Sequence, residues 1–256
     1  MVSVKCCLAV TDCFPLVTER AVAMVFDLAD GINWYLVFLF SISLHEAAHA
    51  WAASHLGDDT AKLAGQITLD PTPHVKRAPF GTVIVPLVSY FLTGGIIGWA
   101  HAPYDPKWAR QYPARSALMA IAGPLANLTM ALIALILIRI GSEWRVLWIS
   151  ENVALGRIVC VENKSSFLGF LANMLSITYR LNIFLGVFNL LPLPPLDGSK
   201  IPLFFLPSIL TEKYWTFLCH PYSALIGTYT AWQLFGMGAP KILEISVDIL
   251  RFVTQN

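Results

Sequence analysis

The residues that could do chemistry are gathered in one short stretch, Ser43-Leu-His45-Glu46-Ala-Ala-His49-Ala50. On an α-helix, residues four apart differ by about 40° around the axis and about 6 Å along it, so the two imidazoles can converge on one metal ion. Glu46 lies close to the same face, where its carboxylate can hold a water molecule beside the metal. The His-Glu-x-x-His pattern therefore predicts a zinc site that serves hydrolysis.

The environment of this motif is unusual. It follows an aromatic and aliphatic run, residues 32–40, that is typical of a membrane-spanning helix. In a soluble chain so short a motif could be a chance match, or its histidines could be satisfied by neighbouring side chains. Within a membrane the cost of desolvating two histidines and a glutamate favours a functional site.

The third metal ligand is a choice between His55 and Asp197. His55 lies ten residues after His45, which is the spacing of the extended motif of some soluble metalloproteases, but Ala52 stands where that motif needs a glycine to reverse the chain. On an uninterrupted helix His55 would lie about 15 Å from His45 along the axis. Asp197 follows a predicted spanning segment in a proline-rich turn, and a carboxylate completes a two-histidine zinc site.

Composition indicates what kind of protein must position these groups. The chain has 256 residues, of which 56% are hydrophobic and 13% charged, whereas a soluble domain carries about 25% charged residues. We therefore expect an all-α polytopic membrane protein, a bundle of about four to six transmembrane helices with a small re-entrant or β element. The net charge of +1 gives no basic surface for nucleic acid, so no nucleic-acid partner is expected.

Hydropathy divides the chain into elements. Three spans are predicted at residues 32–56, 114–140 and 167–191, and another segment at 222–238 could also cross. An amphipathic helix is predicted at 241–253. A short strand is predicted at Gly65–Leu69, where apolar and polar residues alternate. We expect an amphipathic lead-in at residues 1–31, a catalytic core at 32–200 and C-terminal membrane-associated segments at 201–256.

The metal also predicts a topology. If Asp197 joins the two histidines, both ligand-bearing helices must cross the membrane in the same direction, which needs an odd number of crossings between them. Residues 80–100, broken by Pro86, Gly94, Gly95 and Gly98, are therefore predicted to be re-entrant. The basic residues of the segments that connect the spans then lie on one side of the membrane, and the positive-inside rule predicts that this side is cytoplasmic. They are Lys62, Lys76, Arg77, Lys107, Arg110 and Arg115. The zinc site is expected nearer the cytoplasmic side of a bacterial plasma (inner) membrane.

Three ordered motifs resemble those of the site-2 protease family of intramembrane zinc metalloproteases. They are His45-Glu46-x-x-His49, Gly123-Pro124-x-x-Asn127 and Asn189-x-x-Pro192-x-Pro194-x-Leu196-Asp197-Gly198. The likeness covers roughly residues 33–200 and is closest to short members without an inserted or appended domain. Two departures, Lys76-Arg77 and His101, fall on segments expected to face the substrate.

The resemblance implies roles for particular residues. His45, His49 and Asp197 would bind one Zn²⁺ ion and Glu46 would be the general base. Asn127 and Asn189 could stabilise an oxyanion or bind the substrate backbone, although an interhelical hydrogen bond is an equal alternative for Asn127. The unwound substrate could pair with the edge of the predicted strand through Gly65, Ile67 and Leu69.

The partners implied are transmembrane protein substrates within the lipid bilayer. Residues 141–166 are too few for an inserted globular domain, so control would come from substrate shape, prior cleavage or a separate regulatory membrane partner. The main alternative is a non-catalytic membrane protein of the same fold that binds client transmembrane helices without cutting them. An ion transporter is a further alternative, but the sequence lacks the internal repeat that such proteins often have.

Overall fold

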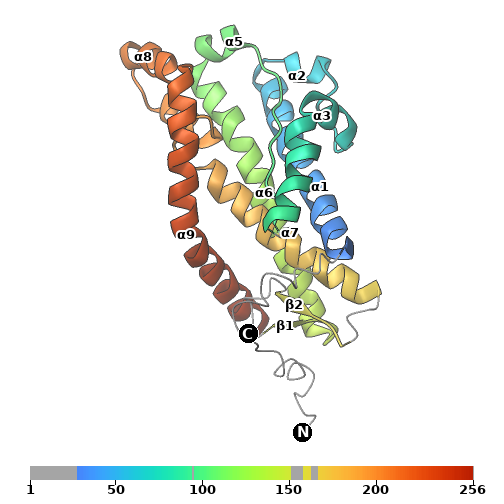
Figure 1. Ribbon diagram of the computed structural model, residues 1–256. Helices are drawn as coiled ribbons and strands as arrows, with labels where there is room; N and C mark the ends of the chain where they lie inside the picture. The colour runs from blue at the N-terminus through green and yellow to red at the C-terminus, as the bar shows by residue number, and fades with distance from the viewer. Residues whose placement is uncertain (1–27, 94, 151–157, 163–166, 256) are drawn as a thin grey trace.

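The computed structural model describes residues 28–93, 95–150, 158–162 and 167–255, and it is predominantly helical (Figure 1). The predicted lead-in at 1–31 lies outside the described residues except for its last four, which belong to the first helix. This architecture confirms the predicted all-α fold with a small β element.

Helix α1 (Leu28–Leu56) carries the first motif and has 29 residues. It ends where glycine was expected to end it, because Gly57 has a φ of +104°, a left-handed conformation that other residues adopt only with strain. No break interrupts the helix between His45 and His55. The buried face of α1 includes Val37, Phe38 and Ile42, which pack against α7 residues Ile177 and Leu181.

Two further long helices complete the central layer. Helix α6 (Pro113–Glu143) begins with a proline at its first position, where the missing N–H costs nothing. Helix α7 (Phe167–Asn189) follows, and α6 packs extensively against both α1 and α7. By length and apolar composition, α1, α6 and α7 could each cross a membrane. Among the described residues, α6 is the one candidate span between α1 and α7, which is compatible with the odd number of crossings that was predicted.

Three helices meet these criteria within the described chain, against about four to six expected. The difference arises at two segments. Residues 80–100 form only a π-helix (Phe80–Ile84) and the short helix α4 (Val85–Thr93). The two elements predicted near the C-terminus are one continuous helix, α9 (Pro221–Gln255), whose glycines, tyrosines and charged residues lower its mean hydropathy.

The segment after the π-helix reverses direction, as expected of a re-entrant element. After α4 the chain returns without helix, and the Trp99 N–H donates to the Gly81 carbonyl at 3.0 Å. The two arms touch because glycines face each other. A Cβ at Gly81 would lie 2.3 Å from the Trp99 carbonyl oxygen, and one at Gly98 would lie 2.4 Å from the Gly81 carbonyl oxygen.

The strand predicted at Gly65–Leu69 does not form; these residues make a turn and bends. Local bonds draw the segment back onto helix α3 (Pro71–Arg77): the Asp70 N–H donates to Thr68 Oγ1, and the His74 ring nitrogen Nε2 lies 3.1 Å from the Thr68 carbonyl oxygen. The sheet of the described chain pairs β1 (Trp148–Ile149) with β2 (Val159–Cys160) in antiparallel register.

Short helices lie at the opposite end of the molecule from this sheet (Figure 1). They are α2 (Thr60–Leu63), α3, α5 (Pro106–Gln111) and α8 (Ser208–Leu218). A 3₁₀-helix (Asp197–Phe204) connects the turn after α7 to α8 and packs against α6. The third candidate ligand therefore begins an element that α6 holds in place.

Candidate metal centre

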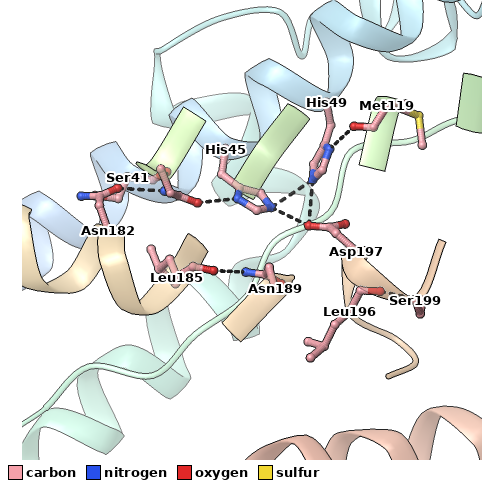
Figure 2. Close-up of polar contacts among 11 residues, drawn as sticks. Ser41, His45, His49, Met119, Asn182, Leu185, Asn189, Leu196, Asp197 and Ser199 are labelled. Carbon is pink, nitrogen blue, oxygen red and sulfur yellow. Dashed lines mark hydrogen bonds and ion pairs between the residues drawn. The ribbon is translucent and has the colours of Figure 1, made fainter. Parts of the chain in front are cut away.

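The structure brings together the three residues that the sequence nominated as metal ligands (Figure 2). The Nε2 atoms of His45 and His49 lie 2.9 Å apart. Asp197 Oδ2 lies 3.1 Å from the first nitrogen and 3.2 Å from the second. Both histidines are buried, 6% and 8% exposed. Tetrahedral zinc with bonds of about 2.0–2.2 Å sets its ligand atoms roughly 3.3 Å apart, close to this arrangement.

The hydrogen bonds of the two Nδ1 atoms determine which ring nitrogen of each histidine carries the proton. His49 Nδ1 lies 2.8 Å from the Met119 carbonyl oxygen, which can only accept a hydrogen bond. His45 Nδ1 lies 2.6 Å from Asn127 Oδ1. Each Nδ1 therefore carries the proton, and each Nε2 presents a lone pair. Two lone pairs 2.9 Å apart repel unless a cation lies with them, so the donor set fits a metal ion.

Helix α6 leaves room beside these nitrogens because it has a glycine there. A Cβ at Gly123 would lie 2.4 Å from His49 Nε2 and 2.6 Å from His45 Nε2. Any side chain at this position would occupy the space that the ring nitrogens face. The glycine of the Gly-Pro-x-x-Asn motif therefore keeps space open beside the ring nitrogens of the candidate metal centre.

The carboxylate of Glu46 is buried and incompletely satisfied. Its side chain is 4% exposed, and among the described residues Oε2 has no hydrogen-bond partner. Glu46 also lines the cavity that contains the two histidines and Asp197. An unpaired buried carboxylate oxygen is costly in a structural role, and it suits a group that accepts a proton.

The cavity itself measures about 480 Å³. Its walls are the metal centre, the returning arm of the re-entrant element (residues 99–104), the turn at 194–197 and part of α8. The predicted substrate-binding residues lie elsewhere. Gly65, Ile67 and Leu69 are exposed and do not line the cavity, so their role in substrate binding stays a prediction without positional support.

The two asparagines occupy different places. Asn189 lines the cavity, and its amide nitrogen donates to the Leu185 carbonyl at 3.0 Å. Asn127 is fully buried and does not line the cavity. Its amide accepts from His45 and donates to the Ser41 carbonyl at 3.3 Å and to Asn182 Oδ1 at 2.8 Å. Asn127 therefore has no free donor to offer a substrate in this arrangement.

Asn182 was missed by the sequence reasoning. It is fully buried in α7, and its amide nitrogen donates to Ser41 Oγ and to the Thr178 carbonyl, each at 2.9 Å. Because the Thr178 carbonyl can only accept, it fixes the orientation of the Asn182 amide, which in turn orients Asn127. The sequence feature that could have identified Asn182 is its position seven residues before Asn189, which places both amides on the same face of an apolar helix.

The turn that carries Asp197 is also held firmly. A Cβ at Gly198 would lie 2.3 Å from the Leu190 carbonyl oxygen, so the turn closes only with glycine there. Ser199 Oγ donates to the Leu196 carbonyl at 2.6 Å, and Tyr214 of α8 donates to the Ser199 carbonyl at 2.8 Å. These contacts position the carboxylate between the two imidazoles.

His55 does not join the centre. It is exposed near the end of α1, and its Nδ1 lies 2.8 Å from the Trp51 carbonyl oxygen. His74 is buried against the Thr68 carbonyl and does not line the cavity. The position of His55 agrees with the expectation that it does not bind the metal.

Comparison with known proteins gives a consistent result. The model of peptidase family M50 matches residues 34–217. The protein described as "Putative zinc metalloprotease YwhC" from Bacillus subtilis is 32% identical over 221 residues, which cover 82% of this chain and 90% of that protein. The Rip2 protein of Mycobacterium tuberculosis, described in the same words, is 32% identical over 163 residues, 63% of this chain and 52% of its own length. No solved structure matches the chain.

Proposed function

Because the chain belongs to peptidase family M50, the site-2 protease family, we propose that it is a zinc-dependent endopeptidase that cuts peptide bonds within or near transmembrane segments of membrane proteins. The class of zinc metalloprotease follows from the family. The intramembrane substrate rests on the position of the site. Its histidines lie within α1, a helix apolar enough to span a membrane.

The proposed ligands are His45, His49 and Asp197, and the proposed general base is Glu46. When bound, zinc supplies a Lewis acid that activates water at neutral pH and polarises the scissile carbonyl. Glu46 accepts a proton from the attacking water through its unpaired Oε2 and later donates that proton to the leaving amine. The Nδ1 bonds of the histidines hold both rings with their Nε2 atoms towards the cavity.

The two asparagines take separate roles in this proposal. Asn189 lines the cavity and keeps one amide proton and its oxygen free of the Leu185 bond, so it can bind the substrate backbone or a developing oxyanion. Asn127 is a positioning residue, because every polar atom of its amide is already used to orient His45. For Asn127 the proposal takes up the interhelical hydrogen bond that the sequence left open as an alternative.

The observation that carries the proposal is the unpaired carboxylate oxygen of Glu46 beside three convergent metal-ligand atoms. A protein that only binds client helices would have no need for a buried carboxylate whose oxygen lacks a partner. The orientation is proposed from charge: the basic residues of α2, α3 and α5 lie at one end of the molecule, which would face the cytoplasm.

A direct test uses the full chain in detergent or nanodiscs with one equivalent of zinc and a panel of single-span substrates. The parent should cut at least one substrate, and Glu46→Gln should bind zinc equally while losing at least about 10³-fold in rate. Equal cleavage by both proteins would remove Glu46 from the mechanism. Zinc binding with client binding but no cleavage by the parent would support the non-catalytic alternative.

A further inference from the structure

A lysine lies in the cavity close to the metal centre. Lys200 lines the cavity and is half-buried, three residues after Asp197 in the 3₁₀-helix. In a 3₁₀-helix, side chains three apart stand above one another, so Lys200 and Asp197 lie along the same face. The Lys200 ammonium lies 4.3 Å from the centre of the Tyr104 ring, which belongs to the opposite wall. This cation–π contact holds a positive charge at the edge of the catalytic cavity.

A second cavity continues the first and adds two more cations. It measures about 280 Å³ and shares Tyr104, Trp215 and Cys219 with the catalytic cavity. Its further lining includes Lys107 and Arg110, which lie three residues apart on α5 and are exposed. Because the two cavities share wall residues they are adjacent, and we refer to them together as the groove: Lys200 and the candidate ligands line one part, and Lys107 and Arg110 of α5 line the other.

The groove has an excess of positive charge away from the metal. The carboxylates among its described lining residues are Glu46 and Asp197, both part of the metal centre. Within the described chain, Lys200, Lys107 and Arg110 take part in none of the ion pairs, which are formed by Lys62, Arg139, Lys241 and the candidate histidine ligands. Three cations that form no ion pair within the described chain would attract an anionic ligand to this groove and disfavour a cationic one.

We propose that this groove recognises acidic side chains of the substrate next to the cleavage site, with Lys200, Lys107 and Arg110 as specificity-determining residues. The inference rests on the proposed function and deepens it. An extended chain advances about 3.3 Å per residue, so a substrate segment that leaves the metal centre along the groove would meet these cations. We favour a peptide over a lipid headgroup because Lys200 shares the catalytic cavity with Glu46.

The test measures binding separately from cleavage. The sample is the full-length Glu46→Gln protein, loaded with zinc and placed in phosphatidylcholine nanodiscs. It is titrated with three single-span peptides, which carry two glutamates, two glutamines or two lysines on one side of the central segment. A second set of three peptides carries the same residues on the other side. We expect the glutamate peptide of one set to bind roughly five- to tenfold more tightly than its glutamine counterpart, with the advantage shrinking at high salt. Equal affinity of all peptides would overturn the proposal.

Variants assign the effect to the groove. Lys200→Gln and the double change Lys107→Gln with Arg110→Gln should each reduce the preference, and Lys107→Glu with Arg110→Glu should shift it towards the lysine peptide. Lys213→Gln is the matched control, because Lys213 is exposed on α8 and lines neither cavity. A preference that survives all the groove variants would contradict the assignment.

Further measurements distinguish a peptide site from a lipid site, and they test the charge preference separately from the protease assignment. In phosphatidylglycerol nanodiscs, groove variants that lose anionic-lipid binding but keep the parent's peptide preference would identify a lipid site and overturn the proposal. If the parent cleaves every peptide at the same rate and Glu46→Gln binds them equally, the protease assignment stands and the charge preference fails. If glutamate peptides bind selectively but are never cut, the charge preference stands and the protease assignment fails.

Discussion

The ring of His45 on α1 is oriented from α6, because its Nδ1 atom lies 2.6 Å from Asn127 Oδ1. Asn127 is in turn held by the Ser41 carbonyl and by Asn182 of α7. Three helices that lie far apart in the sequence therefore converge on one imidazole. Such second-layer contacts fix the tautomer of a metal-binding histidine and the direction of its lone pair.

Replacing Asn127 should weaken the metal site without unfolding the protein. Asn127→Leu leaves the buried His45 Nδ1–H unpaired, so zinc affinity should fall roughly 10- to 100-fold. Asn127→Asp keeps an acceptor for this proton and should retain more of the affinity. Competition with a chelator of known affinity measures the change. Thr129→Ala, an exposed change on the same helix, is the control. Parent-like affinity in Asn127→Leu would show that His45 needs no such support.

Gly123→Ala tests the space beside the ring nitrogens. In an ordinary helix this change is favourable by about 1 kcal/mol. Here the new Cβ would lie 2.4 Å and 2.6 Å from the two Nε2 atoms, so we expect zinc binding to be lost while helical content is kept. Gly236→Ala on α9 is matched, because a Cβ there has no neighbour within 4 Å, and it should keep zinc. Full zinc occupancy in Gly123→Ala would mean that α6 shifts easily.

Asp197 and His55 can be compared directly as the third ligand. Asp197→Ala should lower zinc affinity by at least roughly 100-fold, because it removes a ligand atom 3.1–3.2 Å from both Nε2 atoms. His55→Ala should leave zinc affinity unchanged, since His55 is exposed and bonded to the Trp51 carbonyl. Metal analysis of both proteins after dialysis against a weak chelator decides between them. The opposite ranking would move the third ligand to the end of α1.

Gly57→Ala probes how α1 ends. The φ of +104° at Gly57 strains any residue with a Cβ, so unfolding should become easier by about 1 kcal/mol. Denaturant titration in detergent measures this loss, and zinc affinity should stay the same because Gly57 lies two turns beyond His49. Gly236→Ala again serves as the control with a small effect of opposite sign. Undiminished stability would indicate that the helix end rearranges.

Several features could be predicted from the sequence because they depend on local spacing. The four-residue interval between His45 and His49 specifies a shared helix face, and the apolar run around them predicts that this face lies in a membrane. Ala52 removes the turn that His55 would need, which left Asp197 as the predicted third ligand. The end of α1 at Gly57 and the re-entrant reversal before Trp99 were also expected from glycine and proline positions.

Other features depended on contacts between distant segments. Alternation at Gly65–Leu69 suggested a strand, but a strand needs a partner, and the local bonds to Asp70 and His74 gave the segment a different structure. Asn127 and Asn189 looked alike as amides in apolar helices. Only the packing of α6 between α1 and α7 decided that one supports a histidine while the other lines the cavity.

The sequence by itself determined the metal chemistry, because ligand type and helical period are local properties of the chain. The tertiary structure alone decided the surroundings of the site: the space beside Gly123, the hydrogen bonds from Asn182 to Asn127 and from Asn127 to His45, and the two adjacent cavities lined by Lys200 and by α5. These depend on how closely helices approach and which faces they turn to one another. Packing of the whole chain sets both, and no single segment encodes them.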